Sequence, residues 1–588
     1  MSNHDNLTNS IRVDVVRICN FRSLKNIEIE LGDHNLLVGM NNSGKTSFLK
    51  ALHIALGADR RILSSDDFYI DQSGKEVERI MIDFRIVPVG EGRFSQIWID
   101  NDFGSDIIAV DSDDQQFVAV RTIITRDVVK NDFVLERKKL VKWVAFADWQ
   151  TIEHQGSAPH FDQLTSFFID AQRDLVGDLR ARSSYMGRLL AKIEMPDDEL
   201  EKRLSELNDD IVSKSEVLSH VQQTLAGLNR TVPSFGDGVS INPVNKKMRD
   251  LLKGVGVSFA DGDGASFPLE SHGMGTRSWA SLLSFDAYIS WTGKLAEKEK
   301  LPFHPVLCLE EPEAHLHPNA QRLVYRQLCK GIGQRIVSTH SPYIAAQANL
   351  GEILHFRKIG GITQIQKIPV KKFEAEDIRK IQREVMRSRG ELLFASAVVL
   401  FEGETEEQAL PMFAERHWKQ NPFERGVCFV GVGGDGNYAP FLGILAVLHI
   451  PCFIFSDGEP KACKRVSEAI TKAAINKNDI NVITLPNDKA IEGYLIDQGY
   501  QDELKLAFIE SHKLFQNQQH EGNKKNEILA WTDEQLAKEL KNNKTKMAVH
   551  WANAILALEG KRAIPEHIRL LLQRIDTRLP SNQEKVTS

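Results

Sequence analysis

The stretch Gly39-Met-Asn-Asn-Ser-Gly-Lys-Thr46 decides the fold of the N-terminal half. It fits the pattern G-x-x-x-x-G-K-[ST] and lies between a strand predicted at 35–38 and a helix predicted from near Thr46 to Gly57. There the glycines let backbone N–H groups close around phosphates, Lys45 would reach the β- and γ-phosphates, and the Thr46 hydroxyl would bind Mg²⁺. The predicted nucleotide-binding residues are Gly39, Asn41, Asn42, Ser43, Gly44, Lys45, Thr46 and Ser47.

A second part of the same site is predicted far downstream, where an apolar strand at 306–309 ends in Glu310 and Glu311. A carboxylate at such a strand tip can hold Mg²⁺, and its neighbour can orient the attacking water, so Glu310 is assigned to the metal and Glu311 to the water. Another strand, at 334–338, is followed by His340, which is placed to contact the γ-phosphate.

Composition places the chain among ordinary globular proteins. Its 588 residues suggest about three domains or two large ones. The net charge of -7 means that any contact with nucleic acid must use a local basic patch. The six Cys form no C-x-x-C pair, so a zinc ribbon and a disulfide framework are unsupported, and free thiols fit a reducing cytoplasm. No signal peptide and no membrane span are expected.

The rest of the N-terminal half combines strand and helix patterns. Alternating segments at 11–18 and 26–31 predict half-buried strands, and those within 77–147 predict an antiparallel β insertion. The periodicity is helical from about 162 to 230. Within it, the charged stretch at 197–207 has Leu at helical spacing, which fits either a solvated amphipathic helix or an antiparallel arm that joins two subunits.

Acidic residues follow two short strands in the C-terminal third. The strand at 397–401 leads into Glu402 and Glu406, and the strand at 451–455 leads into Asp457 and Glu459. Because the carboxyl ends of parallel strands meet in one crevice, these side chains should converge. Such a cluster repels itself unless cations neutralise it, so it predicts Mg²⁺ or Mn²⁺ sites that could serve both the attacking and the leaving oxygen of a phosphodiester.

The order of the motifs resembles the ABC-type ATPases of the SMC/RecF/OLD kind. Asn20-Phe-Arg-Ser-Leu24 ahead of the P-loop adds to this resemblance, which implies two heads that sandwich ATP and hence a dimer or higher oligomer. In such ATPases a signature loop covers the ATP of the other subunit. Here Ser271 and Gly273 stand where that loop belongs, although the sequence departs from Leu-Ser-Gly-Gly-Gln, and Gln172 is a Q-loop candidate.

The C-terminal acids resemble a TOPRIM domain, whose first Glu matches Glu402 and whose Asp-x-Asp motif matches Asp457-Gly-Glu459 with Glu in the second place. An ABC ATPase followed by TOPRIM resembles the OLD family of ATP-dependent endonucleases, including Gabija-type and retron-associated nucleases, over about 11–360 and 396–565. That resemblance implies Glu492 as a further acid and Lys561 as a late cation. The catalytic residues then expected are Glu402, Glu406, Asp457, Glu459, Glu492, Lys561 and Glu311, and the expected metal ligands are Thr46, Glu310, Glu402, Glu406, Asp457, Glu459 and Glu492.

The sequence therefore predicts an α/β protein with an ABC-type ATPase head, a β insertion, a helical dimerisation insertion and a Rossmann-like TOPRIM domain. The expected boundaries are 1–160 and 246–390 for the two ATPase parts, 161–245 for the insertion, and 391–588 for the nuclease domain with a helical extension.

The expected function is ATP-regulated, metal-dependent DNA cleavage in antiphage defence, with ATP and Mg²⁺ or Mn²⁺ as cofactors. The expected partners are DNA, a second copy of the chain, and a helicase-like protein or the reverse-transcribed DNA of a retron. The alternatives are an SMC/RecF-like DNA-binding ATPase that does not cut, a topoisomerase or primase, and a protein-interaction ATPase.

Overall fold

The structure is a computed structural model that describes residues 10–57, 63–71, 74, 77–90, 92–127, 132–152, 154–172, 197–219, 258–260, 266–433, 437–473, 475, 480–511 and 518–579. The chain divides into two compact units. The first consists of 1–12, 87–117 and 159–335, and the second of 13–86, 118–158 and 336–588. Within the described ranges no helix combines the length and the apolar character that crossing a bilayer requires.

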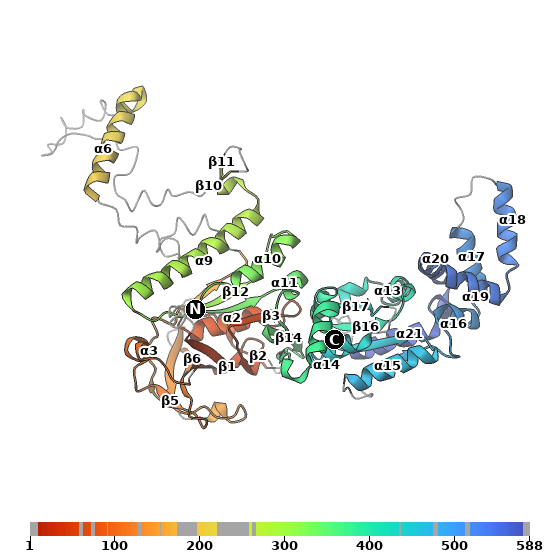
Figure 1. Ribbon diagram of the computed structural model, residues 1–588, viewed down its shortest axis with the longest axis horizontal. Coiled ribbons are helices and arrows are strands. Elements are labelled where there is room, and N and C mark those ends of the chain that lie inside the picture. Colours follow the sequence, from red (N-terminus) through yellow and green to blue (C-terminus); the bar gives the residue numbers. More distant parts are fainter. Residues whose placement is uncertain are drawn as a thin grey trace. The chain divides into compact units, whose positions relative to one another are not determined.

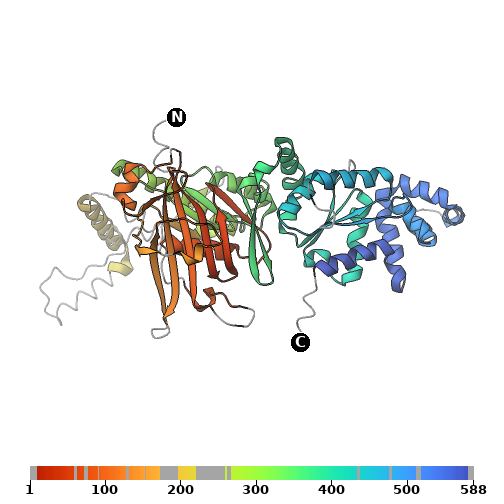
Figure 2. The same cartoon turned by 90° about the horizontal axis from the view of Figure 1, so that it is seen from below.

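An antiparallel sheet forms one part of the second unit, and its red and orange strands run side by side in Figure 2. Its path is β2-β1-β4-β6-β7-β8, and the pairing of β4 with β6 and of β6 with β7 is antiparallel. The antiparallel β insertion predicted within 77–147 is therefore confirmed. The strands are β1 (Ile11–Phe21), β2 (Leu24–Glu30), β4 (Arg79–Pro88), β6 (Gln116–Asp127), β7 (Asp132–Leu140) and β8 (Gln155–Ser157).

A second sheet of this unit carries the glycine-rich loop. The strand β3 (His34–Val38) lies between β14 (Ile353–Ile359) and β13 (Gln334–Ser338), and β15 (Ile362–Lys367) pairs with the outer edge of β14. The pairing of β14 with β3 is parallel. After β3 the chain passes through the loop into α2 (Lys45–Ala55), as the sequence predicted.

The first unit contains a parallel pair of strands, β9 (Ser166–Ile169) and β12 (Val306–Glu310). The helix α9 (Met274–Glu299) precedes β12, and α10 (Pro318–Leu328) follows it. Of the predicted helical insertion, α6 (Asp197–Lys214) is described and covers the charged stretch, whereas 173–196 and 220–245 lie outside the described residues. Whether α6 is a subunit-joining arm stays open. The remaining strands of this unit are β5 (Ile108–Val110), β10 (Ser258–Ala260) and β11 (Ser266–Pro268).

The C-terminal part of the second unit is built on a four-stranded parallel sheet with the order β17-β16-β18-β19. Helices connect the strands, so the predicted parallel α/β domain is confirmed (Figure 1). The strands are β16 (Ala397–Phe401), β17 (Val427–Gly431), β18 (Cys452–Ser456) and β19 (Asn481–Thr484). The connecting helices are α13 (Glu404–Trp418), α14 (Tyr438–Val447) and α15 (Pro460–Lys472). The helices that follow are α16 (Ile491–Asp497), α17 (Gln501–Ser511), α18 (Gln518–Leu529), α19 (Asp533–Asn542), α20 (Lys544–Leu556) and α21 (Glu566–Arg578).

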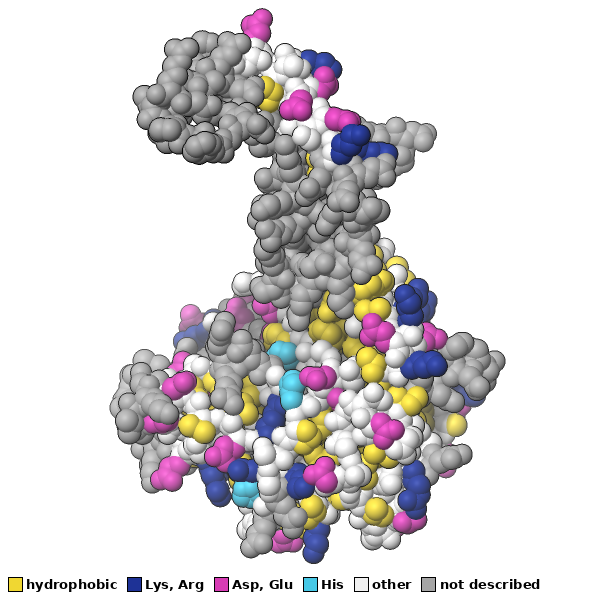
Figure 3. Space-filling view, turned by 90° about the vertical axis from the view of Figure 1, so that its left-hand side faces the viewer, with side chains coloured by type: hydrophobic (Ala, Val, Ile, Leu, Met, Phe, Trp, Pro, Cys, Tyr) yellow, Lys and Arg dark blue, Asp and Glu magenta, His cyan; other side chains and the backbone are white. Residues whose placement is uncertain are grey.

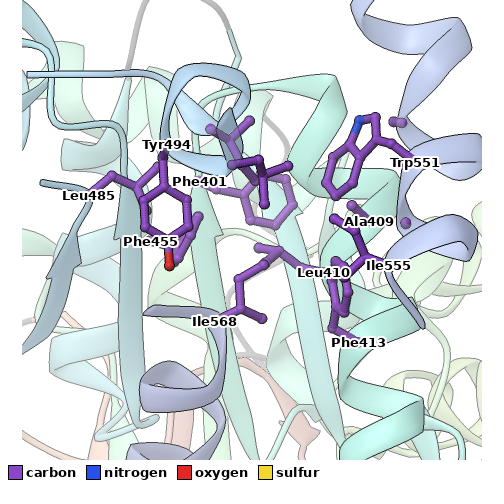
Figure 4. Packing of buried hydrophobic residues seen from close by; sticks show 14 of the residues in the cluster. Phe401, Ala409, Leu410, Phe413, Phe455, Leu485, Tyr494, Trp551, Ile555 and Ile568 are labelled. Carbon is purple, nitrogen blue, oxygen red and sulfur yellow. The ribbon is translucent and has the colours of Figure 1, made fainter. Parts of the chain in front are cut away.

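The strand side chains of this domain alternate between two apolar layers. Val399 and Phe401 belong to a large buried cluster with Phe413 of α13, Trp551 of α20 and Ile568 of α21 (Figure 4). The intervening strand residues point to the other face of the sheet. This packing explains why the C-terminal helices form one body with the sheet, and it fixes the first turn of α20 relative to α13.

The surface carries charges of both signs. On the face shown in Figure 3, the described Lys and Arg side chains are interspersed with Asp and Glu rather than gathered by sign. This distribution agrees with the small net charge of -7 in a chain of 588 residues.

Candidate active site

The glycine-rich loop has the backbone geometry that its sequence requires. Gly39 has a φ of 136° and Gly44 a φ of 103°, both in the region that favours glycine. A Cβ on Gly39 would overlap the carbonyl oxygen of Phe356, and one on Gly44 would overlap the Thr363 side chain. Gly44 also caps the N-terminus of α2. The loop is therefore packed against the strands beside it, and only glycine fits at these two positions.

Lys45 is buried within this loop. Its ammonium donates to the carbonyl oxygens of Gly39, at 2.8 Å, and Met40, at 2.9 Å, and it lies 3.4 Å from the Ser43 hydroxyl. The loop thus holds the ammonium inside the curve of its own backbone. A cation in this position, at the positive end of α2, attracts phosphate.

His340 follows β13 in the same unit. The backbone N–H of Thr339 donates to the carbonyl of Leu37 in β3, at 3.1 Å, which places this turn next to the strand that leads into the loop. Burial, and after it the charge of Lys45, lower the pKa of His340 to about 4. His340 is therefore neutral near pH 7 and lies within the field of the loop lysine.

The predicted nucleotide-site residues Glu310, Glu311, Ser271 and Gly273 belong to the first unit. Glu310 ends β12, and Glu311 follows it with a φ of 43°. Ser271 precedes α9, and Gly273 caps that helix. A Cβ on Gly275 would come within 2.6 Å of the carbonyl oxygen of His315, so this stretch packs against the turn that follows the two acids. The joint action of these residues with the glycine-rich loop remains a prediction.

In the C-terminal domain, Glu402 and Asp457 stand at the same edge of the sheet. Glu402 follows β16 and Asp457 follows β18, and the two strands are parallel neighbours with Leu400 beside Ile454. The Asp457 carboxylate accepts a hydrogen bond of 3.1 Å from the backbone N–H of Ile491, the first residue of α16. The predicted convergence of these strand-end acids is therefore observed.

Two further predicted acids are buried beside Asp457. Glu406, in the first turn of α13, and Glu492, in the first turn of α16, each have a relative exposure of 5%. Burial raises the pKa of Glu406, and the charges of Asp457 and Glu492 raise it further. Burial also raises the pKa of Asp457, with Glu492 as the next contributor and Glu459, the residue that caps α15, adding to it. These carboxylates form one group of mutually repelling charges.

A cation beside the buried acids of this cluster is Lys544, the first residue of α20. Its ammonium lies 3.6 Å from Oε1 of Glu492. Burial by itself would lower the pKa of Lys544. The carboxylates of Glu492, Asp457 and Glu406 outweigh that effect and raise this pKa.

The sequence did not single out Lys544, and Lys561 as the late cation stays a prediction. Lys561 is exposed, and its carbonyl accepts a hydrogen bond of 3.1 Å from Arg569. Lys544 reaches the cluster because Thr545 donates to Glu404 at 2.8 Å, which joins the first turns of α20 and α13. The sequence signal that could have located Lys544 is the helical apolar pattern that begins directly after Asn543.

Arg465 of α15 and Tyr438 of α14 were not predicted. Arg465 forms an ion pair with Glu402 through Nη1 and Oε1. Tyr438 is 1% exposed; burial raises its pKa first, and the charges of Glu402, Glu406 and Asp457 raise it further. One tyrosine thus experiences three of the predicted acids, which shows that they surround a common point.

The donor set fits hard divalent cations. Carboxylate oxygens are the ligands that Mg²⁺ and Mn²⁺ prefer, and among the described residues the buried Oε1 of Glu492 accepts no hydrogen bond, although the Lys544 ammonium lies 3.6 Å away. The pKa values of Glu406 and Asp457 are raised by burial first and then by the neighbouring carboxylates. Within the described ranges, however, no three Asp, Glu, His or Cys side chains are already placed to bind one ion together. Binding would require small side-chain movements.

Residues 35–346 match the protein family described as "AAA domain, putative AbiEii toxin, Type IV TA system". Residues 393–458 match "Overcoming lysogenization defect protein-like, TOPRIM domain", a range that includes Glu402, Glu406 and Asp457.

Individual relatives agree with both matches. The chain is 24% identical over 517 residues to the OLD nuclease of Thermus scotoductus, covering 79% of this chain and 86% of that protein. It is 20% identical over 565 residues to endonuclease GajA of Bacillus cereus, covering 80% and 78%. The solved C-terminal region of the Burkholderia pseudomallei OLD protein is 22% identical, with a TM-score of 0.25, and covers 32% of this chain and 99% of that one. Because the first family match spans more than half of the 588 residues, the chain belongs to this AAA-domain family, and it carries an OLD-like TOPRIM domain at 393–458.

Proposed function

We propose that the protein is an ATP-regulated DNA endonuclease that cleaves phosphodiester bonds at the C-terminal acid cluster with two divalent cations. The observation that carries this proposal is the convergence of Glu402, Glu406, Asp457 and Glu492 with Lys544 at one edge of the parallel sheet. Acids and a lysine in this arrangement suit phosphoryl chemistry, which needs charge stabilisation more than covalent catalysis.

The acids would hold Mg²⁺ or Mn²⁺, and Glu459 is close enough to Asp457 in the chain to contribute. Bound divalent cations would supply electrostatic stabilisation of the attacking and leaving oxygens. Glu406 and Asp457 must lose their protons to become ligands, because their raised pKa values favour protonation without a cation. Lys544 would place its ammonium beside the scissile phosphate and stabilise the negative charge that develops there.

The ATPase part would bind and hydrolyse ATP. Lys45, Thr46 and His340 would contact its phosphates and Mg²⁺, with Glu310 and Glu311 as the metal-holding and water-orienting acids. Ser271 and Gly273 would cover the nucleotide of a second copy, which makes the assembly a dimer or a higher oligomer. We assign 1–160 and 246–390 to this ATPase, 161–245 to the insertion and 391–588 to the nuclease domain.

The experiment that tests this function is incubation of supercoiled plasmid with Mg²⁺ or Mn²⁺, with and without ATP. Wild type should nick or linearise the plasmid, Glu402→Ala should leave it intact, and Lys45→Ala should still cut but lose its response to ATP. Glu415→Ala, which removes an exposed carboxylate from the same helix α13, is the matched control and should cut like wild type. A Glu402→Ala variant that cuts at the wild-type rate would instead support the DNA-binding ATPase that does not use these acids.

A role in defence against phage follows as the biological part of the proposal. Cells that express the wild-type protein with its genetic neighbours should reduce phage plaque formation, and cells that express Glu402→Ala should not. Protection that is equal in both strains would separate any defence role from DNA cleavage.

A further inference from the structure

Arg465 forms an ion pair with Glu402, the carboxylate that follows strand β16. Its Nη1 pairs with Oε1 of Glu402, and the two side chains are 40% and 23% exposed. The pair therefore lies at the open side of the cluster, whereas Glu406 and Glu492 are buried beneath it. Arg465 is the sixth residue of α15, the helix that begins directly after Asp457-Gly-Glu459.

Arg465 lies within the field of the same acids that were assigned to the cations. Tyr438 experiences the charges of Glu402, Glu406 and Asp457 in one direction and that of Arg465 in the other. Lys544 pairs with Glu492 on the buried side of the cluster, whereas Arg465 pairs with Glu402 on its open side. The guanidinium of Arg465 contacts Glu402 through Oε1.

A carboxylate has two oxygens, but a guanidinium and a metal ion compete for its single negative charge. A divalent cation at Glu402 would repel the Arg465 guanidinium and weaken the ion pair. A displaced guanidinium stays tethered to α15, and Lys461 lies one turn earlier on the same face of that helix. Phosphate is the natural partner for a released guanidinium, because the two groups form paired charge-assisted hydrogen bonds.

We propose that Arg465 is an exchangeable counter-ion, which neutralises Glu402 while the metal site is empty and moves to a phosphate of the DNA strand when Glu402 takes a divalent cation. This inference rests on the proposed nuclease function and deepens it. This exchange couples metal binding to DNA binding. The enzyme then binds the DNA backbone tightly only when its metal site is filled.

Titration calorimetry of the full-length protein with MnCl2 measures the exchange without any cleavage. Arg465→Ala should bind Mn²⁺ about two- to fivefold more tightly than wild type, because a partly exposed ion pair no longer competes. Arg465→Lys keeps the charge and should remain near wild type. Lys464→Ala is the matched control, since it removes the neighbouring charge of a side chain that instead pairs with Glu468 at 3.8 Å.

Plasmid cleavage at saturating Mn²⁺ measures the second half of the inference. Arg465→Ala should lose about tenfold or more in kcat/KM, because the phosphate contact is absent, and Arg465→Lys should recover part of that loss. Unchanged or weaker Mn²⁺ binding by Arg465→Ala would overturn the exchange, and undiminished cleavage would overturn the phosphate contact. Failure of the proposed function itself is distinguishable, because wild type would then neither bind Mn²⁺ nor cut.

Discussion

The ammonium of Lys544 lies 3.6 Å from the buried Oε1 of Glu492, although the two residues belong to different helices, α20 and α16. This contact brings a cation from the C-terminal extension to acids that follow the strands of the parallel sheet. The extension is therefore part of the candidate active site rather than an appendage to it.

Replacing Lys544 should damage cleavage far more than replacing Lys561. We expect Lys544→Ala to lower kcat by about 10²-fold, the usual cost of removing a preorganised charge-stabilising donor. Lys561→Ala should stay within about twofold of wild type, because Lys561 is exposed and the cation interacting with the acids is Lys544. Rates of plasmid linearisation at saturating Mg²⁺ compare the two variants, and a larger loss for Lys561→Ala would support the assignment made from the sequence.

The metal-free protein should lose stability as the pH rises from about 5 to about 8. The pKa values of Glu406 and Asp457 are raised in the folded state, so the folded protein binds more protons than the unfolded chain in this range. This contribution to stability is complete below the pKa values that Glu406 and Asp457 have in the unfolded chain. It is lost as the pH rises through the pKa values that they have in the folded protein. Thermal melting in EDTA should show this trend for the nuclease domain.

Two controls identify the groups behind that pH dependence. Glu406→Gln should flatten it, because the amide keeps the shape of the side chain without its charge. Added Mg²⁺ should raise the melting temperature at about pH 8 more than at about pH 5, because deprotonated carboxylates bind the cation. A melting temperature in EDTA that rises with pH in both proteins would contradict this account of the cluster.

Gly39→Ala should weaken nucleotide binding. The added Cβ meets the carbonyl oxygen of Phe356, and a φ of 136° is unfavourable for alanine, which together should cost about 1–3 kcal/mol. The loop would shift, and affinity for a fluorescent ATP analogue should fall at least about tenfold. Gly32→Ala is the control, because its Cβ would make only ordinary contacts. Wild-type affinity in Gly39→Ala would show that the loop does not need this geometry.

His340 should act as a neutral group. Burial and the charge of Lys45 hold its pKa at about 4, so it stays uncharged at every pH from about 6 to about 8. If His340 contacts ATP as proposed, His340→Gln should slow ATP hydrolysis by a factor that does not change across this range. A factor that grows steeply toward low pH would mean that a charged imidazole takes part.

Local patterns were enough to predict the two chemical motifs. The glycine-rich loop followed from Gly39 to Thr46 standing between a strand and a helix, and the acids followed from Glu402 and Asp457 coming directly after apolar strands. These predictions succeed because alternation of side chains and helical periodicity are encoded within a few residues. The parallel pairing of the strands then brings their carboxyl ends together wherever the sheet forms.

The sequence by itself determined which strand-end carboxylates gather and placed the glycine-rich loop between a strand and a helix, since strand, turn and helix signals lie within each motif. Only the tertiary structure decided which cations meet those carboxylates. Lys544 lies beside Glu492 because packing of α20 against α13 sets where the first turn of α20 lies, and Arg465 reaches Glu402 through the placement of α15. Such pairings depend on how whole helices dock, and a docking geometry is the sum of many buried contacts that no short stretch of sequence contains.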